Sequence, residues 1–245
     1  LHVRSRRQRQ MCIRDRILYQ DSRLVAIHKP PGLLVHRSYY ARDVKQFAVQ
    51  ELRNFLGGQH VYPIHRLDRK TAGVLLFALD KEMLSLMNEI FNSRAVTKEY
   101  WAIVRGYTEQ EGVIDYPLTN DDGQRQDAKT YYQTLQHAEI NLPFGKHATS
   151  RYSLVKALPE TGRMHQLRKH LRHIAHPILG SRPHGCNKQN KLWLENFQLE
   201  QMMLLARSLR FTHPESQEEV CIKANPTAEF LRVCEILKIN MTKFL

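Results

Sequence analysis

In residues 65–79, a highly charged loop runs directly into an uninterrupted apolar stretch. Residues 74–79 read Val-Leu-Leu-Phe-Ala-Leu, and an apolar run of this length, preceded by a glycine, is typical of a buried strand. Gly73 permits backbone conformations that other residues resist, so the chain can turn tightly before the strand. The charged loop is therefore expected to be anchored to the rigid centre of a sheet.

Asp68 is the one acidic residue in residues 65–73, and Arg66, Arg69 and Lys70 lie within two positions of it. Nearby positive charges favour the ionised form of a carboxyl group through Coulomb attraction. A carboxylate kept ionised in this way is suited to acting on a substrate. The same pattern also fits an ordinary ion pair in a loop, so charge alone leaves both readings open.

The charge of the whole chain points to a polyanionic partner. The 245 residues carry a net charge of +13, and lysines and arginines that neutralise phosphates release condensed counterions, which favours nucleic acid. Residues 1–16 contain six arginines and one aspartate, a net of +5, so +8 remains in the rest of the chain. We interpret residues 1–16 as a non-native or poorly packed basic tail resembling translated adapter sequence, with a basic RNA-binding arm as the alternative.

The remaining composition indicates a soluble protein of a reducing compartment, and we predict a cytoplasmic location. Four cysteines lie far apart without a CxxC pair, which suggests neither a zinc knuckle nor a disulfide framework. No apolar run is long enough to span a bilayer, so no membrane association is expected. We expect a monomer without an obligatory protein partner.

Strand and helix signals are mixed from Ile17 onwards, which predicts one α+β domain over residues 17–245. We expect a hairpin-like entry made of strands 24–28 and 33–36, and a polar connector at 119–130. Helices are expected after Asp43, after Asp80, over about 164–174 and from Asn225 as cap. Further strands are expected near residues 61–64, 99–105, 151–158, 204–211 and 220–222.

The nonapeptide at 65–73 resembles the motif around the catalytic aspartate of the RluA-type pseudouridine synthases: His-Arg-Leu-Asp, two residues, Thr, a small residue and Gly. Lys29-Pro30-Pro31-Gly32, residues 98–106, 161–168 and 175–180 resemble further motifs of this family in the same order. The resemblance covers about Ile17 to Lys223. It implies a pseudouridine synthase fold with a mixed, mainly antiparallel sheet flanked by helices and loops, and a central RNA-binding cleft.

The resemblance also implies roles for individual residues in an isomerase that turns uridine into pseudouridine. Asp68 is expected to act on a nucleotide flipped out of its helix, by attack on ribose C1′, addition to uracil C6, or removal of a ribose proton. Tyr100 is expected to stack on the flipped base and Arg168 to orient Asp68, although a half-buried sheet tyrosine and a solvated arginine are the structural alternatives. RNA contacts are expected from Arg66, Arg69, Lys70, Arg163 and His165.

The substrate implied by the resemblance is tRNA, because residues 35–38, 149–158, 170–171 and 184–185 resemble the subgroup that modifies uridine 65 in the TψC arm. Ribosomal RNA is the alternative substrate, and a non-catalytic RNA-binding protein is the alternative class. No S4-like module is expected before Lys29. Three positions depart from the family pattern, where Asp, Pro and His are common: Ser181, Lys70 and Leu205.

No cofactor and no metal are implied. Residues 165–176 contain four histidines, but Arg168, Lys169 and Arg172 would repel a cation there, and no acidic or cysteine ligand completes a recognisable site. We expect these histidines to cap, pack or contact phosphate instead.

Overall fold

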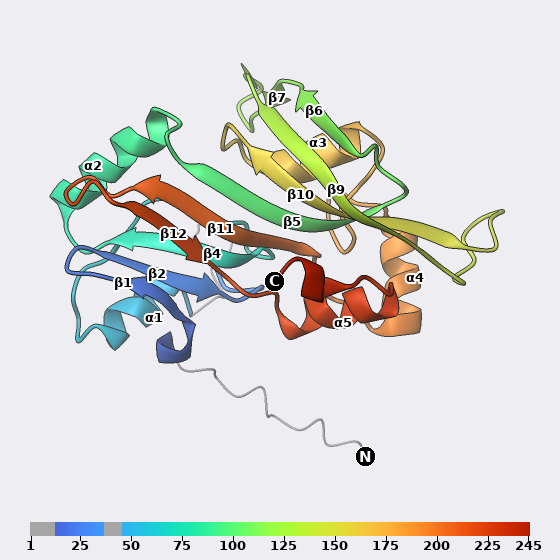
Figure 1. Cartoon of the computed structure of the whole chain (residues 1–245), viewed down its shortest axis with the longest axis horizontal. Helices are drawn as coiled ribbons and strands as arrows, with labels where there is room; N and C mark the ends of the chain where they lie inside the picture. The colour runs from blue at the N-terminus through green and yellow to red at the C-terminus, as the bar shows by residue number, and fades with distance from the viewer. Residues whose placement is uncertain (1–12, 37–45) are drawn as a thin grey trace, which may run out of the picture.

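A single large sheet forms the centre of the molecule in the computed structural model, which describes residues 13–36 and 46–245 (Figure 1). Its strands follow the order β1 (Ile17–Gln20), β2 (Leu24–Lys29), β4 (Ala72–Ala78), β11 (Leu204–Thr212), β5 (Thr97–Arg105), β10 (Ser150–Pro159), β9 (Lys129–Ile140) and β6 (Glu111–Asp115). In addition, β3 (Tyr62–Pro63) pairs with β4, and β12 (Glu219–Lys223) pairs with β11. This mixed sheet with its helices confirms the predicted α+β class.

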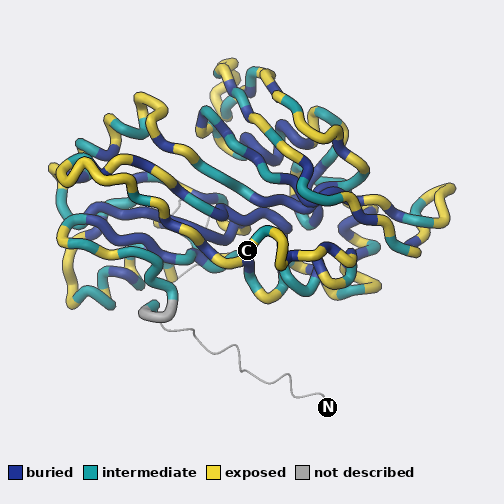
Figure 2. The backbone as a smooth tube through the Cα atoms, viewed as in Figure 1, coloured by how far each residue is buried: buried dark blue, intermediate teal, exposed yellow. Residues whose placement is uncertain are grey.

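Helices cover the sheet because its strands alternate apolar side chains between two faces. They are α1 (Ala48–Phe55), α2 (Lys81–Asn92), α3 (Gln166–His173), α4 (Asn187–Phe197) and α5 (Ala228–Ile236). Along β4, Leu75 and Phe77 pack with α1, while Val74 and Leu76 pack with α2. Figure 1 shows α1 and α2 on opposite sides of this half of the sheet, and the central strands are the buried ones in Figure 2. Among the described residues, no helix is both long and apolar enough to cross a membrane.

Tyr100 lies where two parts of the core meet. It packs against the cluster of α1 with β2 and β4, and also against the cluster of α3 with β5 and β10. The neighbouring strand β11 places Ala206 opposite Tyr100 and Leu204 opposite Ala102. The tyrosine is therefore fixed on a rigid strand at the boundary between the two clusters.

Strands β4 and β11 form a parallel pair in a sheet whose other pairs are antiparallel, with Ala72 opposite Leu205 and Gly73 opposite Ala206. Gly73 has a φ of +116°, and a Cβ at this position would lie 2.1 Å from the carbonyl oxygen of Ala206. The glycine is thus required by close packing of two backbones as well as by its positive φ. This contact fixes the end of the Asp68 loop.

Several boundaries differ from those predicted. The return strand expected at residues 33–36 is wrong, because only an isolated bridge joins Leu34 to Phe47, and β2 instead forms its hairpin with β1. The last helix begins at Ala228 with Thr227 as its cap, so the assignment of Asn225 is also wrong. The expected connector contains a small hairpin of β7 (Leu118–Thr119) and β8 (Arg125–Gln126). The proposed cap Asp43 lies outside the described residues.

The described chain starts inside the segment that we interpret as a basic tail. Ile13–Arg16 form a short 3-10 helix, and Ile13 packs against the cluster that includes α1. Arg16 forms an ion pair with Glu51 at 3.4 Å. The last four residues of the segment therefore belong to the folded body, whereas residues 1–12 lie outside the described part.

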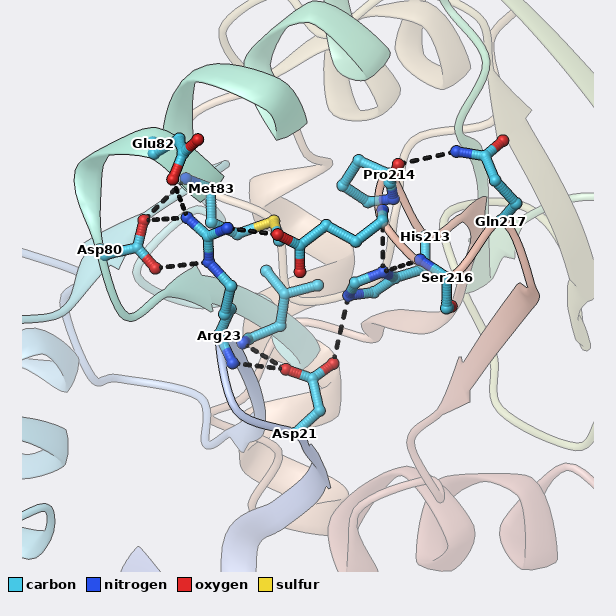
Figure 3. Close-up of polar contacts among 11 residues, drawn as sticks. Asp21, Arg23, Asp80, Glu82, Met83, His213, Pro214, Ser216 and Gln217 are labelled. Carbon is cyan, nitrogen blue, oxygen red and sulfur yellow. Dashed lines mark hydrogen bonds and ion pairs between the residues drawn. The ribbon is translucent and has the colours of Figure 1, made fainter.

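A polar network joins three turns at one corner of the molecule (Figure 3). Arg23, in the β1–β2 turn, donates two hydrogen bonds to Asp80 at 2.8 and 2.6 Å and also pairs with Glu82 and Glu215. The Nδ1 of His213 accepts hydrogen bonds from the backbone N–H groups of residues 215 and 216, so the ring carries its proton on Nε2. This Nε2 lies 3.4 Å from Asp21 Oδ2. The network ties the start of α2 to the ends of the flanking strands.

We expect Gly73→Ala to destabilise the protein by about 3 kcal/mol or more, because the new methyl group overlaps the β11 backbone. Gly123→Ala is the matched control: Gly123 also has a positive φ of +79°, but nothing lies within 4 Å of the position that its new methyl group would take. That control should cost only about 1 to 2 kcal/mol in urea unfolding. Equal losses in the two variants would show that the β4 and β11 backbones can move apart without cost.

Asp80 caps α2 by accepting a hydrogen bond from the Met83 N–H, and asparagine can also cap a helix. We therefore expect the free energy of unfolding of Asp80→Ala to be about 1 kcal/mol lower than that of Asp80→Asn. Hydrogen bonding from Arg23 lowers the pKa of Asp80 to about 2. The ion-pair contribution is therefore present above the ordinary pKa near 4 and is lost as the pH falls through about 2. Urea unfolding of wild type and Asp80→Asn should converge over that interval, and a constant difference would contradict the assignment.

Candidate functional site

A buried lysine, Lys29, anchors the loop that carries Asp68. The Nζ of Lys29 donates to the carbonyl oxygens of Pro30, Leu33 and Arg69 at 3.0, 3.0 and 3.1 Å, and the side chain has no solvent exposure. Burial lowers the pKa of Lys29 to about 7, and the negative charge of Asp68 acts in the opposite direction. Gly32 and Arg69 add two further hydrogen bonds between the turn and the loop. Asp68 therefore sits on a loop with little freedom to move.

Arg168 links Asp68 to a third segment of the chain. Its guanidinium donates to Asp68 Oδ2 at 3.0 Å, to the Ser181 hydroxyl at 3.0 Å and to the Arg182 carbonyl at 2.6 Å. The Arg168 side chain is 5% exposed, whereas the Asp68 side chain is 25% exposed. Three fixed acceptors orient the planar guanidinium, so the carboxylate is held in one position while part of it stays accessible.

The structure brings the three predicted catalytic candidates, Asp68, Tyr100 and Arg168, into one hollow of about 100 Å³. A second hollow of about 390 Å³ adjoins it and shares six lining residues with it, namely Arg66, Leu67, Asp68, Gly162, Arg163 and His165. Burial raises the pKa of Tyr100, and the charge of Asp68 raises it further, so the hydroxyl stays protonated. The arrangement offers one carboxylate, one aromatic ring and several cations to a ligand.

The expected RNA-contacting residues divide into two groups. Arg66, Arg163 and His165 line both hollows, and Arg69 lines the larger one. Lys70 is also exposed but borders a different hollow beside Gly180 and Arg182. Four of the five expected residues thus surround Asp68, and Lys70 does not.

The histidines of residues 165–176 are used in packing and hydrogen bonding. His170 bonds to the Thr130 hydroxyl and the Tyr116 carbonyl, both at 2.9 Å, and His176 donates to the Arg105 carbonyl at 2.8 Å. His173 stacks on Tyr116. Within residues 13–36 and 46–245, no group of three or more histidine, cysteine or acidic side chains is arranged to hold a metal ion.

Three supporting residues were not predicted from the sequence as part of the site. Ser181 is fully buried and accepts a hydrogen bond from Arg168, which gives a physical role to a position noted only as a departure. His65 accepts the Leu76 N–H at 3.1 Å, and burial lowers its pKa to about 4, so it is a neutral structural group. His184 faces His165 at 3.1 Å. No local pattern could reveal these contacts, because each partner lies 11 or more residues away.

Comparison with known proteins decides the family. Residues 23–173 match the family model described as RNA pseudouridylate synthase, which spans more than half of the chain. The chain belongs to the RNA pseudouridylate synthase family. The predicted family and the predicted enzyme class, an RNA pseudouridine synthase, are confirmed, and residues 23–173 include Asp68, Tyr100 and Arg168.

Relatives of this synthase cover most of its length. It is 48% identical over 218 residues to a protein of Haemophilus ducreyi named tRNA pseudouridine synthase C, covering 85% of this chain and 89% of that one. It is 46% identical over 231 residues to the protein of the same name from Pasteurella multocida, covering 90% and 95%. The solved structure of human RNA pseudouridylate synthase domain containing 4 matches with a TM-score of 0.72 and 30% identity, covering 92% of this chain and 94% of that one.

We expect Arg168→Lys in this synthase to lower turnover about a hundredfold, because one ammonium group cannot bond to Asp68, Ser181 and Arg182 at once. The free energy of unfolding should fall by about 1 to 3 kcal/mol, since buried acceptors lose their partner. Arg172→Lys, on the exposed side of α3, is the control and should change neither quantity. If Arg168→Lys turned over as fast as the control, the orienting role assigned to Arg168 would be wrong.

Proposed function

We propose that this protein isomerises uridine to pseudouridine in tRNA, at uridine 65 in the acceptor side of the TψC arm, and that it does so in the cytoplasm. The observation that carries the proposal is the convergence of Asp68, Tyr100 and Arg168 in one hollow of a pseudouridine synthase fold. The choice of tRNA is supported by relatives at 44–48% identity that are named tRNA pseudouridine synthase C.

The chemistry explains why these side chains are needed together. The bond from uracil N1 to ribose C1′ must break and a bond from C5 to C1′ must form, which cannot happen within a stacked helix, so the nucleotide is flipped out. Tyr100 then stacks on the free uracil, since an aromatic face holds a ring while allowing it to rotate. Asp68 acts on the nucleoside as an ionised carboxylate, and Arg168 fixes its direction.

The basic residues around the hollow are suited to an RNA backbone. Arg66, Arg69, Arg163 and His165 surround the carboxylate. We assign the three arginines to phosphates and to the space left by the flipped nucleotide, and His165 to the nucleotide inside the hollow. Lys70 lies outside this group, and we assign it to a more distant phosphate. Ser181, in place of the acid that the family commonly has, still accepts a hydrogen bond from Arg168, so this departure is compatible with activity.

The direct test uses tRNA transcripts labelled with tritium at uracil C5, because that hydrogen leaves when C5 bonds to ribose. Wild-type protein should release tritium and place pseudouridine at position 65, read by chemical mapping of the product. Asp68→Asn keeps the shape but removes the charge, and it should lower the rate at least about a thousandfold while the Kd for tRNA changes less than about threefold.

Three results would contradict the proposal. If Asp68→Asn kept the wild-type rate, the carboxylate of Asp68 would not be required for the reaction. Modification of ribosomal RNA fragments but not of tRNA would make ribosomal RNA, the alternative substrate, the correct one and would leave the proposed chemistry intact. Tight RNA binding by wild type without any pseudouridine would indicate a binding protein that has lost turnover.

A further inference from the structure

Two histidine rings meet at the edge of the Asp68 hollow and form a row with the carboxylate. The Nδ1 of His165 lies 3.1 Å from the Nε2 of His184, and the other nitrogen of His165, Nε2, lies 3.9 Å from Asp68 Oδ2. His165 precedes α3 with a φ of 56°, a left-handed conformation that a non-glycine residue keeps only where its surroundings hold it. The backbone therefore fixes where the side chain begins, and the contact with His184 limits where the ring can lie.

Both rings are neutral in this setting. Burial lowers the pKa of His165, and the positive charges of Arg168 and Lys169 add to that effect, although Asp68 and Asp121 act against it. Burial also lowers the pKa of His184 to about 4, again helped by Arg168, Lys169 and Arg172 and by His165 itself. Two neutral rings at 3.1 Å share one hydrogen bond, so one of the facing nitrogens donates and the other accepts.

The charge of Asp68 makes one of the two directions of that hydrogen bond more favourable than the other. If His165 donated from Nδ1, the lone pair of its Nε2 would point at a carboxylate oxygen, which is repulsive. If His184 donates instead, His165 carries its proton on Nε2, and this N–H faces the carboxylate favourably. The second arrangement is the one that electrostatics favours.

We propose that His184 is a positioning residue that holds His165 as the Nε2–H tautomer, so that His165 presents a hydrogen-bond donor to the uracil bound beside Asp68. At 3.9 Å the donor is too far from the carboxylate for a direct hydrogen bond, so it is available to an oxygen atom of the substrate.

The role of this donor follows from the reaction, and this step rests on the function proposed above. When the N1–C1′ bond breaks, its electron pair stays on the uracil ring and spreads onto the two carbonyl oxygens. A fixed N–H aimed at one of these oxygens stabilises the charge as it develops. His165 keeps its proton throughout; the C5–C1′ bond forms, C5 loses a proton and N1 gains one, so the isomerisation is balanced.

The tautomer can be measured directly on the free protein. Two-bond proton–nitrogen correlation spectra of ¹⁵N-histidine-labelled protein distinguish Nε2–H from Nδ1–H rings, and the His165 signals are identified by their loss in His165→Gln. We expect wild type to show His165 as Nε2–H only. A His165 signal of the Nδ1–H type in wild type would overturn the proposal without reference to any RNA.

Two variants of His184 then distinguish a side chain that can donate a hydrogen bond to His165 from one that is polar but too short to do so. Glutamine places an amide N–H near the position of Nε2, whereas the shorter asparagine cannot reach His165. We expect His184→Asn to give a mixture of His165 tautomers, because the partly exposed carboxylate at 3.9 Å favours the Nε2–H form only weakly without the hydrogen bond from His184. The single-turnover rate should fall about tenfold with an unchanged Kd for tRNA. His184→Gln should restore the Nε2–H form and most of the rate, which a merely structural role would not produce.

His60→Gln, an exposed histidine outside the hollow, controls for the loss of a ring, and thermal unfolding checks that both His184 variants are folded. Equal tautomers and equal rates in His184→Asn and wild type would refute the proposal. If wild type forms no pseudouridine in tRNA, the proposed function fails, but the tautomer spectra still decide whether His184 orients His165.

Discussion

The guanidinium of Arg168 is almost fully buried and donates to three acceptors from two other segments, of which only Asp68 carries a negative charge. A buried cation without such partners would be strongly unfavourable, so these segments must come together for the chain to fold around it. The pair that fixes the geometry of the carboxylate is thus also a condition for closing the core between α3, the Asp68 loop and the segment at residues 181–182.

The Asp68 loop is constrained at two points by different means. Directly after Asp68, the backbone carbonyl of Arg69 accepts a hydrogen bond from the buried ammonium of Lys29, which also donates to the carbonyls of Pro30 and Leu33. At its end, Gly73 allows the backbone of β11 to pass at a distance that no side chain would permit. With these two constraints and the hydrogen bond from Arg168, the carboxylate can be presented on a surface without the mobility common in exposed loops.

What could be predicted from the sequence is what depends on neighbouring residues. The existence of β4 and of the helix after Asp80 follows from local apolar patterns, although β4 begins at Ala72 and so includes Gly73. Helix α4 was not predicted because most of its residues are polar. The segment 33–36 has strand-like residues but forms only one bridge, since strand formation requires a partner that local sequence does not specify. Asp68, Tyr100 and Arg168 could be identified from the sequence because they lie in recognisable motifs. The roles of Lys29, Ser181 and His184 could not, because they depend on contacts with distant segments.

The parallel pairing of β4 with β11 affects the order in which the molecule can be assembled. Residues 72 and 205 are neighbours in the sheet, and Leu204 also lines the hollow that contains Asp68. During synthesis, the aspartate and tyrosine leave the ribosome long before this last wall exists. A nascent chain therefore has no finished pocket in which to hold a nucleotide. It can bind a nucleotide only after the C-terminal part of the polypeptide has joined the sheet.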